Sequence, residues 1–286
     1  MKIAVVTDSI ACLPKELVQQ YGIEVLPLEI IHDGKVYRDG VDIAPSEFYN
    51  LLVQTDKLPT TSAPSPGDYL KVLEKLARKG SDILVITLST KFSTTIDSAR
   101  TAADLIKEKF CNITAEILDS RTAAGAQGLV VLAAARAAAS GENLTRVIEV
   151  AKSVMTKVHL VAFLDTLYYL ARGGRVPQAA AWVNSLLKIK PVFQIVPLSG
   201  EASTACLVRT RAKAINYLIK VARKRVSKSP MHVVVMHSNS LREAEKLRDR
   251  LISEFNCTET YVMDFTPVMG VHTGPGLLGI AFYPDG

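Results

Sequence analysis

The sequence predicts an α/β fold in two domains, a mainly parallel domain over residues 1–157 and a domain with antiparallel pairing over residues 158–286. Three observations predict it. Apolar runs typical of buried strands alternate with segments of helical periodicity through most of the first half, as in parallel α/β sheets. In the second half, closely spaced strand-like runs are joined by a short glycine turn. The 286 residues, 48% of them hydrophobic, suffice to fill the cores of two ordinary domains.

The first half predicts strands and helices in alternation. Gly22 and Gly80 mark the ends of two expected helices, because glycine readily adopts the left-handed conformation that ends many helices. The pair Asp33-Gly34 lies between two short apolar runs and predicts a hairpin. The expected elements are strands at 3–6, 24–28, 83–88 and 116–118, hairpin strands at 30–31 and 36–37, and helices at 14–21, 66–79, 93–105 and 125–139.

The second half predicts another α/β layer. Gly173-Gly174 interrupts the chain after its first strand, and Leu198-Ser199-Gly200 joins two strands as a hairpin. No Pro/Gly/Ser-rich linker marks the boundary near residue 158. The expected strands lie at 159–164, 191–196, 202–208, 231–236, 260–263 and 279–283, and the expected helices at 213–228 and 241–255.

The composition argues against several classes of protein. The opening residues 1–8 carry one positive charge and only a four-residue apolar run, which predicts a strand and not a signal peptide. No stretch approaches a membrane span, so we expect a soluble protein without stable membrane insertion. The four scattered cysteines fit a reducing cytoplasm, and neither they nor the five histidines show metal-ligand spacing. A Walker or Gly-x-Gly-x-x-Gly sequence is absent, so we expect neither a metal nor a nucleotide cofactor.

The formal net charge of +6 is concentrated in residues 201–250, which hold twelve Lys or Arg against four Asp or Glu. Many of these cations lie on the polar side of the helix expected at 213–228. Such a face attracts acidic partners, although a solvated helix surface is the simpler interpretation. Because no aromatic residues interleave with the basic ones, we expect no nucleic-acid binding.

Two segments place small hydroxyl residues where helices are expected to begin. In residues 61–66, Ser65 is a candidate N-cap and Pro66 suits the first helical position. In residues 88–95, two serines and three threonines follow a buried strand. The first N–H groups of a helix lack partners and carry partial positive charge. The two segments therefore predict an anion pocket, with ordinary helix caps as the alternative.

Six segments, taken in order, carry a resemblance to a known family. They are residues 3–9, the sequence Thr61-Ser62-Ala63-Pro64-Ser65-Pro66, residues 88–99, Asp119-Ser120 with Gly125 and Gly128, residues 170–176, and His272-Thr273-Gly274-Pro275-Gly276. Each is weak alone, but all six in order are specific. The chain resembles the DegV family of fatty-acid-binding proteins from end to end.

The resemblance implies a bound long-chain fatty acid with its tail buried between the two domains. It also implies that the carboxylate is held by Thr61, Ser62 and Ser93, by the amide of Thr94, and near His272. The family commonly has glycine where this chain has Thr94, and threonine rarely adopts the positive φ that glycine allows. The family is further implicated in presenting fatty acids to a separate ATP-dependent kinase that forms the acyl phosphate used in phospholipid synthesis. In that case this chain is a carrier and not an enzyme.

Several alternatives remain open at this stage. Ser93, His272 and Asp119 could form a hydrolytic triad, although the chain lacks a Gly-x-Ser-x-Gly elbow. His272 could merely stabilise the glycine-rich turn, and Arg175 could be a direct ligand or part of a structural turn. The candidate docking surface for a kinase is the basic helix with its preceding segment, with the residues Arg209, Arg211, Arg223 and Arg225.

Overall fold

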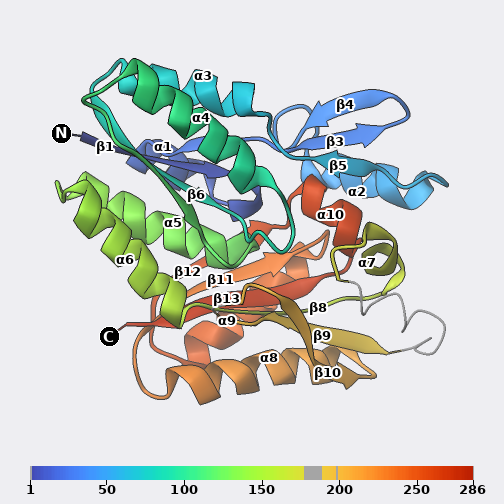
Figure 1. The fold of residues 1–286 in the computed structure, drawn as a ribbon. Coiled ribbons are helices and arrows are strands. Elements are labelled where there is room, and N and C mark those ends of the chain that lie inside the picture. Colours follow the sequence, from blue (N-terminus) through green and yellow to red (C-terminus); the bar gives the residue numbers. More distant parts are fainter. Residues whose placement is uncertain (1, 177–188, 198, 286) are drawn as a thin grey trace.

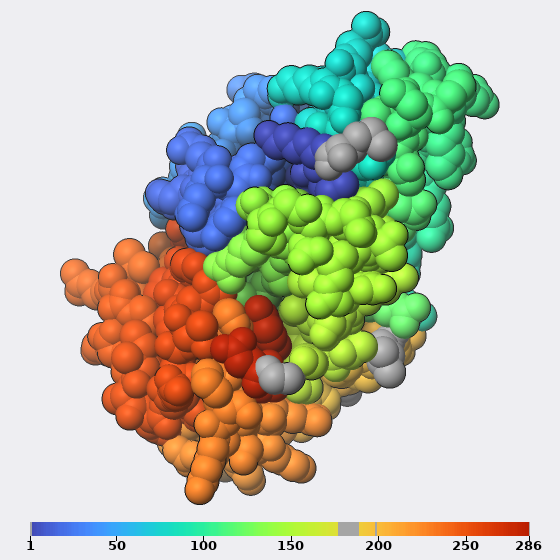
Figure 2. Space-filling model, turned by 90° about the vertical axis from the view of Figure 1, so that its left-hand side faces the viewer, coloured from blue at the N-terminus to red at the C-terminus, as the bar shows by residue number. Residues whose placement is uncertain are grey.

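The protein is built from alternating layers of helix, sheet, helix, sheet and helix. The computed structural model describes residues 2–176, 189–197 and 199–285. Figure 1 shows two sheets lying one above the other, with helices outside each sheet and between them. Figure 2 shows the blue-to-cyan part of the chain in one half of the molecule, the orange-to-red part in the other, and the light-green helices near residues 130–157 between them. The fold class is the α/β class that the sequence predicted.

The first sheet has the strand order β2-β1-β6-β7 and is parallel throughout, as predicted. Its central strand β6 (Ser81–Thr87) is buried along its whole length, which explains its continuous apolar sequence. The other strands are β1 (Lys2–Asp8), β2 (Glu24–Leu26) and β7 (Ala115–Asp119). The associated helices are η1 (Ser9–Ala11), α1 (Lys15–Tyr21), α3 (Pro66–Ala77) and α4 (Thr95–Lys109).

The start of α3 agrees with the sequence, whereas its end differs by two residues. Ser65 caps the helix by accepting from the Asp68 N–H, and the Asp68 carboxylate accepts in turn from the Ser65 N–H. The helix ends at Ala77 with Arg78 as its C-cap, so the expected C-cap Gly80 instead takes its positive φ of 73° in the following turn.

A small antiparallel sheet of order β4-β3-β5 lies beside the larger ones. Its hairpin of β3 (Glu29–His32) and β4 (Lys35–Arg38) confirms the turn predicted at Asp33-Gly34. Its third strand is β5 (Thr60–Ser62), so Thr61 and Ser62 pair with β3 and lie on a strand that precedes α3. The helix α2 (Pro45–Gln54) was not predicted.

The second sheet has the order β10-β9-β8-β13-β11-β12, and among its described pairings all are antiparallel except that of β11 with β12. Residue 198 of the predicted hairpin turn lies outside the described residues. The strands are β8 (His159–Phe163), β9 (Lys190–Ile195), β10 (Ala202–Val208), β11 (Met231–His237), β12 (Cys257–Asp264) and β13 (Leu278–Pro284). Its outer face is covered by α8 (Arg211–Val226) and α9 (Leu241–Glu254).

The helix α5 (Ala124–Ala139) lies between the two large sheets, with α6 (Leu144–Lys157) beside it (Figure 1). A helix buried on all sides must be apolar all round, which explains its alanine-rich sequence. Two glycines permit the close packing: a Cβ at Gly125 would lie 2.8 Å from a Val234 methyl, and one at Gly128 would lie 2.5 Å from the Ala11 carbonyl oxygen. The predicted boundary at residue 158 falls between α6 and β8, but the core is continuous across α5.

Two short helices, α7 (Tyr168–Gly173) and α10 (Pro267–Thr273), pack against each other beside the small sheet. Sequence analysis predicted only glycine-containing turns at these two places. They carry or adjoin Arg175 and His272, and so position the polar groups described next.

Candidate functional site

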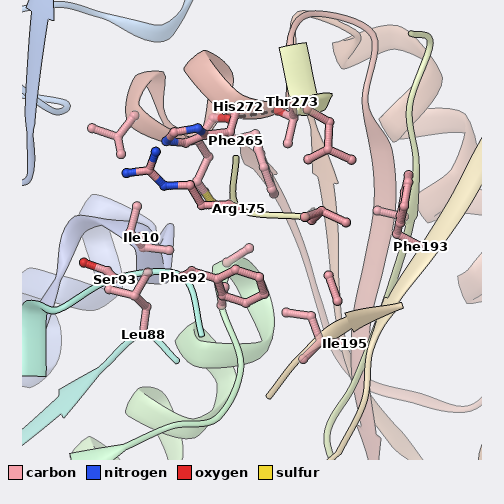
Figure 3. A pocket seen from close by; sticks show the side chains of 18 of the residues that line it. Ile10, Leu88, Phe92, Ser93, Arg175, Phe193, Ile195, Phe265, His272 and Thr273 are labelled. Carbon is pink, nitrogen blue, oxygen red and sulfur yellow. Dashed lines mark hydrogen bonds between the residues drawn. The ribbon is translucent and has the colours of Figure 1, made fainter. Parts of the chain in front are cut away.

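An apolar cavity lies between the first sheet, the small sheet and the inner face of the second sheet. Nearly all of its exposed wall is carbon, and the side chains come from both halves of the chain. Figure 3 shows Phe92, Phe193 and Ile195 lining its apolar part. Other apolar lining residues are Ile10, Leu28, Leu88, Leu164, Leu170, Phe265, Val268 and Leu277. The cavity therefore suits a long apolar ligand.

At one end the cavity meets a polar opening. Figure 3 shows Ser93, Arg175 and His272 gathered at this end, away from Phe193 and Ile195. Thr61, Ser62, Ser93 and Arg175 line both the apolar cavity and an adjoining polar pocket that includes Thr94. We call this end the polar mouth. The structure thus brings all five predicted carboxylate contacts to one region.

The loops after β6 and β7 lie together at the carboxyl edge of the first sheet, as predicted. The Ser89 N–H donates to the Thr122 carbonyl at 2.8 Å, and the Ser120 N–H to the Thr87 carbonyl at 3.0 Å. These bonds hold the serine-rich segment at the edge where ligands of parallel sheets commonly bind.

His272 reaches the polar mouth from α10. Its Nε2 lies 3.1 Å from Thr61 Oγ1, whereas its buried Nδ1 has no hydrogen-bond partner among the described residues. Burial, and secondly the positive charge of Arg175, lower the pKa of His272 to about 4. The imidazole is therefore neutral at pH 7 and links the small sheet to α10 without adding charge.

Gly173 packs against His272, whereas sequence analysis predicted only a turn there. A Cβ there would lie 2.6 Å from His272 Nδ1, so only glycine lets α7 pack against the imidazole. The Arg175 side chain then turns back, and its Nη1 donates to the Gly173 carbonyl at 2.8 Å. In the sequence, this packing was indicated only by the pair Gly173-Gly174 followed by Arg175.

Ser93 and Thr94 lie at the start of α4. Ser93 Oγ is 2.7 Å from Thr95 Oγ1 and accepts from the Thr95 N–H at 3.2 Å. The Thr94 N–H has no acceptor among the described residues. Thr94 takes φ −88°, so replacing the family's glycine requires no positive φ at this position.

Ser62 differs from the other predicted contacts because its hydroxyl already has a partner. Its Oγ donates to a carboxylate oxygen of Glu29, the residue opposite it on β3, at 2.8 Å. Glu29 was not predicted as a site residue. Only the alternation of side chains along the hairpin strand indicated which way it points. The Ser62 proton is thus directed towards the small sheet.

The described hydrogen bonds do not assemble the alternative hydrolytic triad. Ser93 bonds to Thr95 and His272 bonds to Thr61, while Asp119 accepts from Thr90 Oγ1 and the Arg121 N–H. A triad needs its base bonded both to the nucleophile and to an orienting carboxylate. Neither bond is present within the described residues.

The predicted docking surface divides into two parts. Arg211 is not free, because it pairs with Asp165 and Glu243 and lies over the Phe163 ring at 4.9 Å. This corrects its assignment to an exposed basic face. Arg225 lies near the other end of α8, where its charge lowers the pKa of His159 to about 4 after burial, the larger cause. Arg211 and Arg225 therefore lie at opposite ends of α8.

Two further expectations concern metals and membranes. Among the described residues, no group of three or more His, Cys, Asp or Glu lies where it could hold a metal ion. None of the described helices combines the length and apolar character needed to cross a bilayer.

Comparison with known proteins identifies the family. The model of "uncharacterised protein, DegV family" matches residues 2–285. Protein DegV of Bacillus subtilis is 34% identical, with 99% of each chain covered. A DegV family protein of Thermus thermophilus, described with its fatty acid binding, has a TM-score of 0.92 at 28% identity with both chains fully covered. A stearic-acid-binding protein from Eubacterium ventriosum has a TM-score of 0.89 at 26% identity, covering 99% of this chain and 98% of that one. The chain belongs to the DegV family.

Proposed function

We propose that this protein binds one long-chain fatty acid, with the tail in the apolar cavity and the carboxylate at the polar mouth. The observation that carries the proposal is the continuity of a carbon-lined cavity with a mouth of hydroxyl, amide and imidazole groups. Structures of related proteins, described as binding fatty acids, support it.

The tail supplies most of the affinity. Burying about fourteen methylenes at roughly 0.8 kcal/mol each contributes on the order of 11 kcal/mol before ordering costs are subtracted. The carboxylate opposes binding unless its oxygens are hydrogen-bonded, because an unpaired buried charge is very unfavourable. The polar mouth must therefore supply hydrogen-bond donors to the carboxylate while the tail stays in the apolar cavity.

In this proposal Ser93 and the Thr94 N–H donate to the carboxylate. When neutral His272 carries its proton on Nε2, it donates to Thr61 Oγ1 and leaves the Thr61 O–H to donate to the ligand. Ser62 contributes less, because its O–H is directed to Glu29. Arg175 adds positive charge at the rim without a direct bond.

The protein acts as a carrier and presents the bound acid to a separate fatty acid kinase. Neutral donors leave the carboxylate nucleophilic enough to attack a phosphoryl group, whereas a bidentate arginine would engage both oxygens. The docking surface comprises Arg209, Arg223 and Arg225. Charge reversal at Arg223 and Arg225 should slow a reconstituted kinase reaction while lipid binding stays intact. Unchanged turnover would remove this surface from the proposal.

Native mass spectrometry of the purified protein, followed by organic extraction, tests the lipid-binding proposal. We expect one long-chain fatty acid per chain. Ser93→Ala should weaken lipid retention about fivefold to tenfold, since it removes a hydrogen bond to a charged group. Ser153→Ala, the same change at an exposed position on α6, should retain lipid normally.

Two results would overturn the proposal. A protein that is empty as purified and fails to take up added fatty acids contradicts the carrier function. Esterase turnover that disappears in Ser93→Ala would favour the serine hydrolase instead.

A further inference from the structure

Two buried carboxylates lie next to the wall of the apolar cavity. Asp8 ends β1 and has no exposed surface, and Asp39, which follows β4, is 2% exposed. Within the part of the chain that the structure describes, neither forms an ion pair with a lysine, arginine or histidine. A buried charge without a counter-ion is unfavourable unless hydrogen bonds stabilise it, so the donors around these two groups matter.

The donors are backbone N–H groups of the cavity wall. Asp8 Oδ2 accepts from the Leu88 N–H at 2.9 Å, and Asp8 Oδ1 accepts from the Ile10 N–H at 3.1 Å. Asp39 Oδ1 accepts from the Val268 N–H at 3.1 Å. Ile10, Leu88 and Val268 all line the cavity, although they belong to η1, to the segment after β6 and to α10. The two carboxylates therefore hold three separate parts of the wall in place.

Ser9 extends this network to a fourth part of the wall. Its Oγ donates to Asp39 Oδ2 at 2.6 Å and accepts from the Leu28 N–H at 3.1 Å. Leu28 precedes β3 and also lines the cavity. In addition, Gln127 of α5 donates to Asp8 Oδ1 at 3.1 Å. The network thus joins the cavity wall to the helix between the two large sheets.

The hydrogen bonds at Asp8 suit its ionised form. A carboxylate accepts on both oxygens, whereas a protonated carboxyl carries a hydrogen on one of them. Burial raises the pKa of Asp8 to about 6, and the bonds from Leu88, Gln127 and Ile10 offset this effect only in part. At neutral pH the charge therefore lowers the stability of the folded protein, and a purely structural role does not account for keeping it.

The other titratable groups around the two carboxylates carry no positive charge. They are Asp264, Cys12, Tyr49 and Tyr69. Burial raises the pKa of the Cys12 thiol and of both tyrosines, so these three groups stay neutral near pH 7. Asp264 is half-exposed, and water screens its charge. Burial also raises the pKa of Asp39, so mild acid protonates the buried pair.

We propose that Asp8 and Asp39 are positioning residues of the lipid site, and that the cavity holds a fatty acid tightly only while they are ionised. The inference rests on the proposed function, because it concerns the same cavity. Protonation weakens the acceptors of the Leu88, Ile10 and Val268 N–H groups, so the wall segments are held less firmly. Mild acid therefore releases the lipid.

Equilibrium dialysis of radiolabelled palmitic acid against the full chain tests this inference. Asp8→Asn keeps the size of the side chain but loses one acceptor oxygen, so we expect the dissociation constant to rise about tenfold at about pH 7.5. Asp39→Asn should behave in the same way. The matched control is Asp82→Asn. Asp82 is 8% exposed and accepts from the Thr114 N–H at 2.8 Å, but neither residue lines the cavity.

A pH series gives a readout that general destabilisation would not produce. In the unmodified protein and in Asp82→Asn, the dissociation constant should rise about tenfold between about pH 7.5 and about pH 5. In Asp8→Asn most of this rise should be absent, because the amide does not titrate. His272, whose pKa is about 4, changes charge below this range. Protonation of palmitic acid itself affects every variant alike.

Several outcomes would overturn the inference. If Asp8→Asn binds palmitic acid more tightly than the unmodified protein, the charge of Asp8 repels the ligand and does not position the wall. If Asp82→Asn weakens binding as much as Asp8→Asn, the effect is one of general stability. A flat pH series in the unmodified protein contradicts the inference even if both cavity variants fail to fold. If the unmodified protein binds no palmitic acid at about pH 7.5, the proposed function itself fails.

Discussion

Two histidines in this protein show how differently a polar group can be used. His232, on β11, bonds through Nδ1 to Glu259 and through Nε2 to Asp285, each at 2.6 Å. His272, on α10, bonds through Nε2 to Thr61 and leaves Nδ1 without a hydrogen bond. Both are largely shielded from water. Both ring nitrogens of His232 therefore have hydrogen-bond partners, so we call it satisfied, whereas only one ring nitrogen of His272 has a partner, so we call it half satisfied.

The satisfied histidine belongs to a structural network. Arg136 of α5 donates to both oxygens of Glu259, and Tyr283 stacks on the His232 ring at 4.5 Å. This network joins the central helix to the second sheet. The half-satisfied histidine instead faces a cavity that can take a ligand. In this protein the histidine with an unused nitrogen lines the ligand cavity, whereas the histidine of the charged network does not.

The largest expected effect is in the satisfied network. Glu259→Ala removes the partner of both Arg136 and His232 and leaves a partly buried guanidinium without its anion. We expect the free energy of unfolding to fall by about 3 kcal/mol, while lipid retention is unchanged. Urea unfolding and native mass spectrometry measure the two quantities. A variant of normal stability would show that the network is dispensable.

The next effect concerns the packing around His272. Gly173→Ala forces the imidazole away from α7, because the new Cβ would lie 2.6 Å from Nδ1. We expect a loss of about 1–3 kcal/mol in unfolding free energy together with weakened lipid retention. Gly67→Ala, whose Cβ would have 3.6 Å of clearance, is the matched control and should not destabilise α3. If Gly173→Ala retained lipid normally, the position of His272 would not be needed for lipid binding.

The two histidines should also respond oppositely to pH. The pKa of His272 is lowered to about 4 from an ordinary value near 6.5, so its unfolded state binds the proton more readily. Its contribution to stability is therefore lost as pH falls from about 6.5 to about 4. Burial lowers the pKa of His232, but bonds to Glu259 and Asp285 outweigh it and raise the pKa overall. That contribution is present below about pH 6.5 and is lost as pH rises through the folded-state pKa.

Unfolding measured across pH in His272→Gln and His232→Gln would separate these contributions. The first variant should lose part of the acid-side destabilisation, and the second should lose stabilisation on the acid side. Identical pH profiles for the two variants would contradict the distinction between a satisfied and a half-satisfied histidine.

The smallest effect is expected at an exposed ion pair. Arg223 pairs with Glu254 on the outer helices, and 64% of its side chain is exposed. Water screens this pair, so Arg223→Gln should change the unfolding free energy by less than about 0.5 kcal/mol. If Arg223→Gln lowered the unfolding free energy by as much as Glu259→Ala, exposure to water would not explain the difference between the two ion pairs.

Several helices were not predicted, although their sequences have apolar residues at helical spacing. In α6, Val147, Ala151 and Val154 are buried at helical spacing after the N-cap Asn143. In α2, Phe48, Tyr49 and Leu52 are buried after a proline at the first position. Short helices such as α10 lack enough turns for a period to show, and its fully buried apolar residues resemble a strand.

The candidate site was predictable only in part. The hydroxyl residues and His272 were found through motif resemblance, and the structure gathers them at one mouth. The bond between Thr61 and His272 joins residues 211 positions apart, so no local pattern reveals it.

The sequence by itself determined the α/β class, most strands, the N-cap of α3 and the family. These depend on periodicity and short-range hydrogen bonds, which neighbouring residues specify. Only the tertiary structure decided which hydroxyls remain free, which arginines are already paired and which histidine keeps an unused nitrogen. Those properties depend on burial and on partners distant in the chain, because the energy of a polar group is set by what surrounds it after folding.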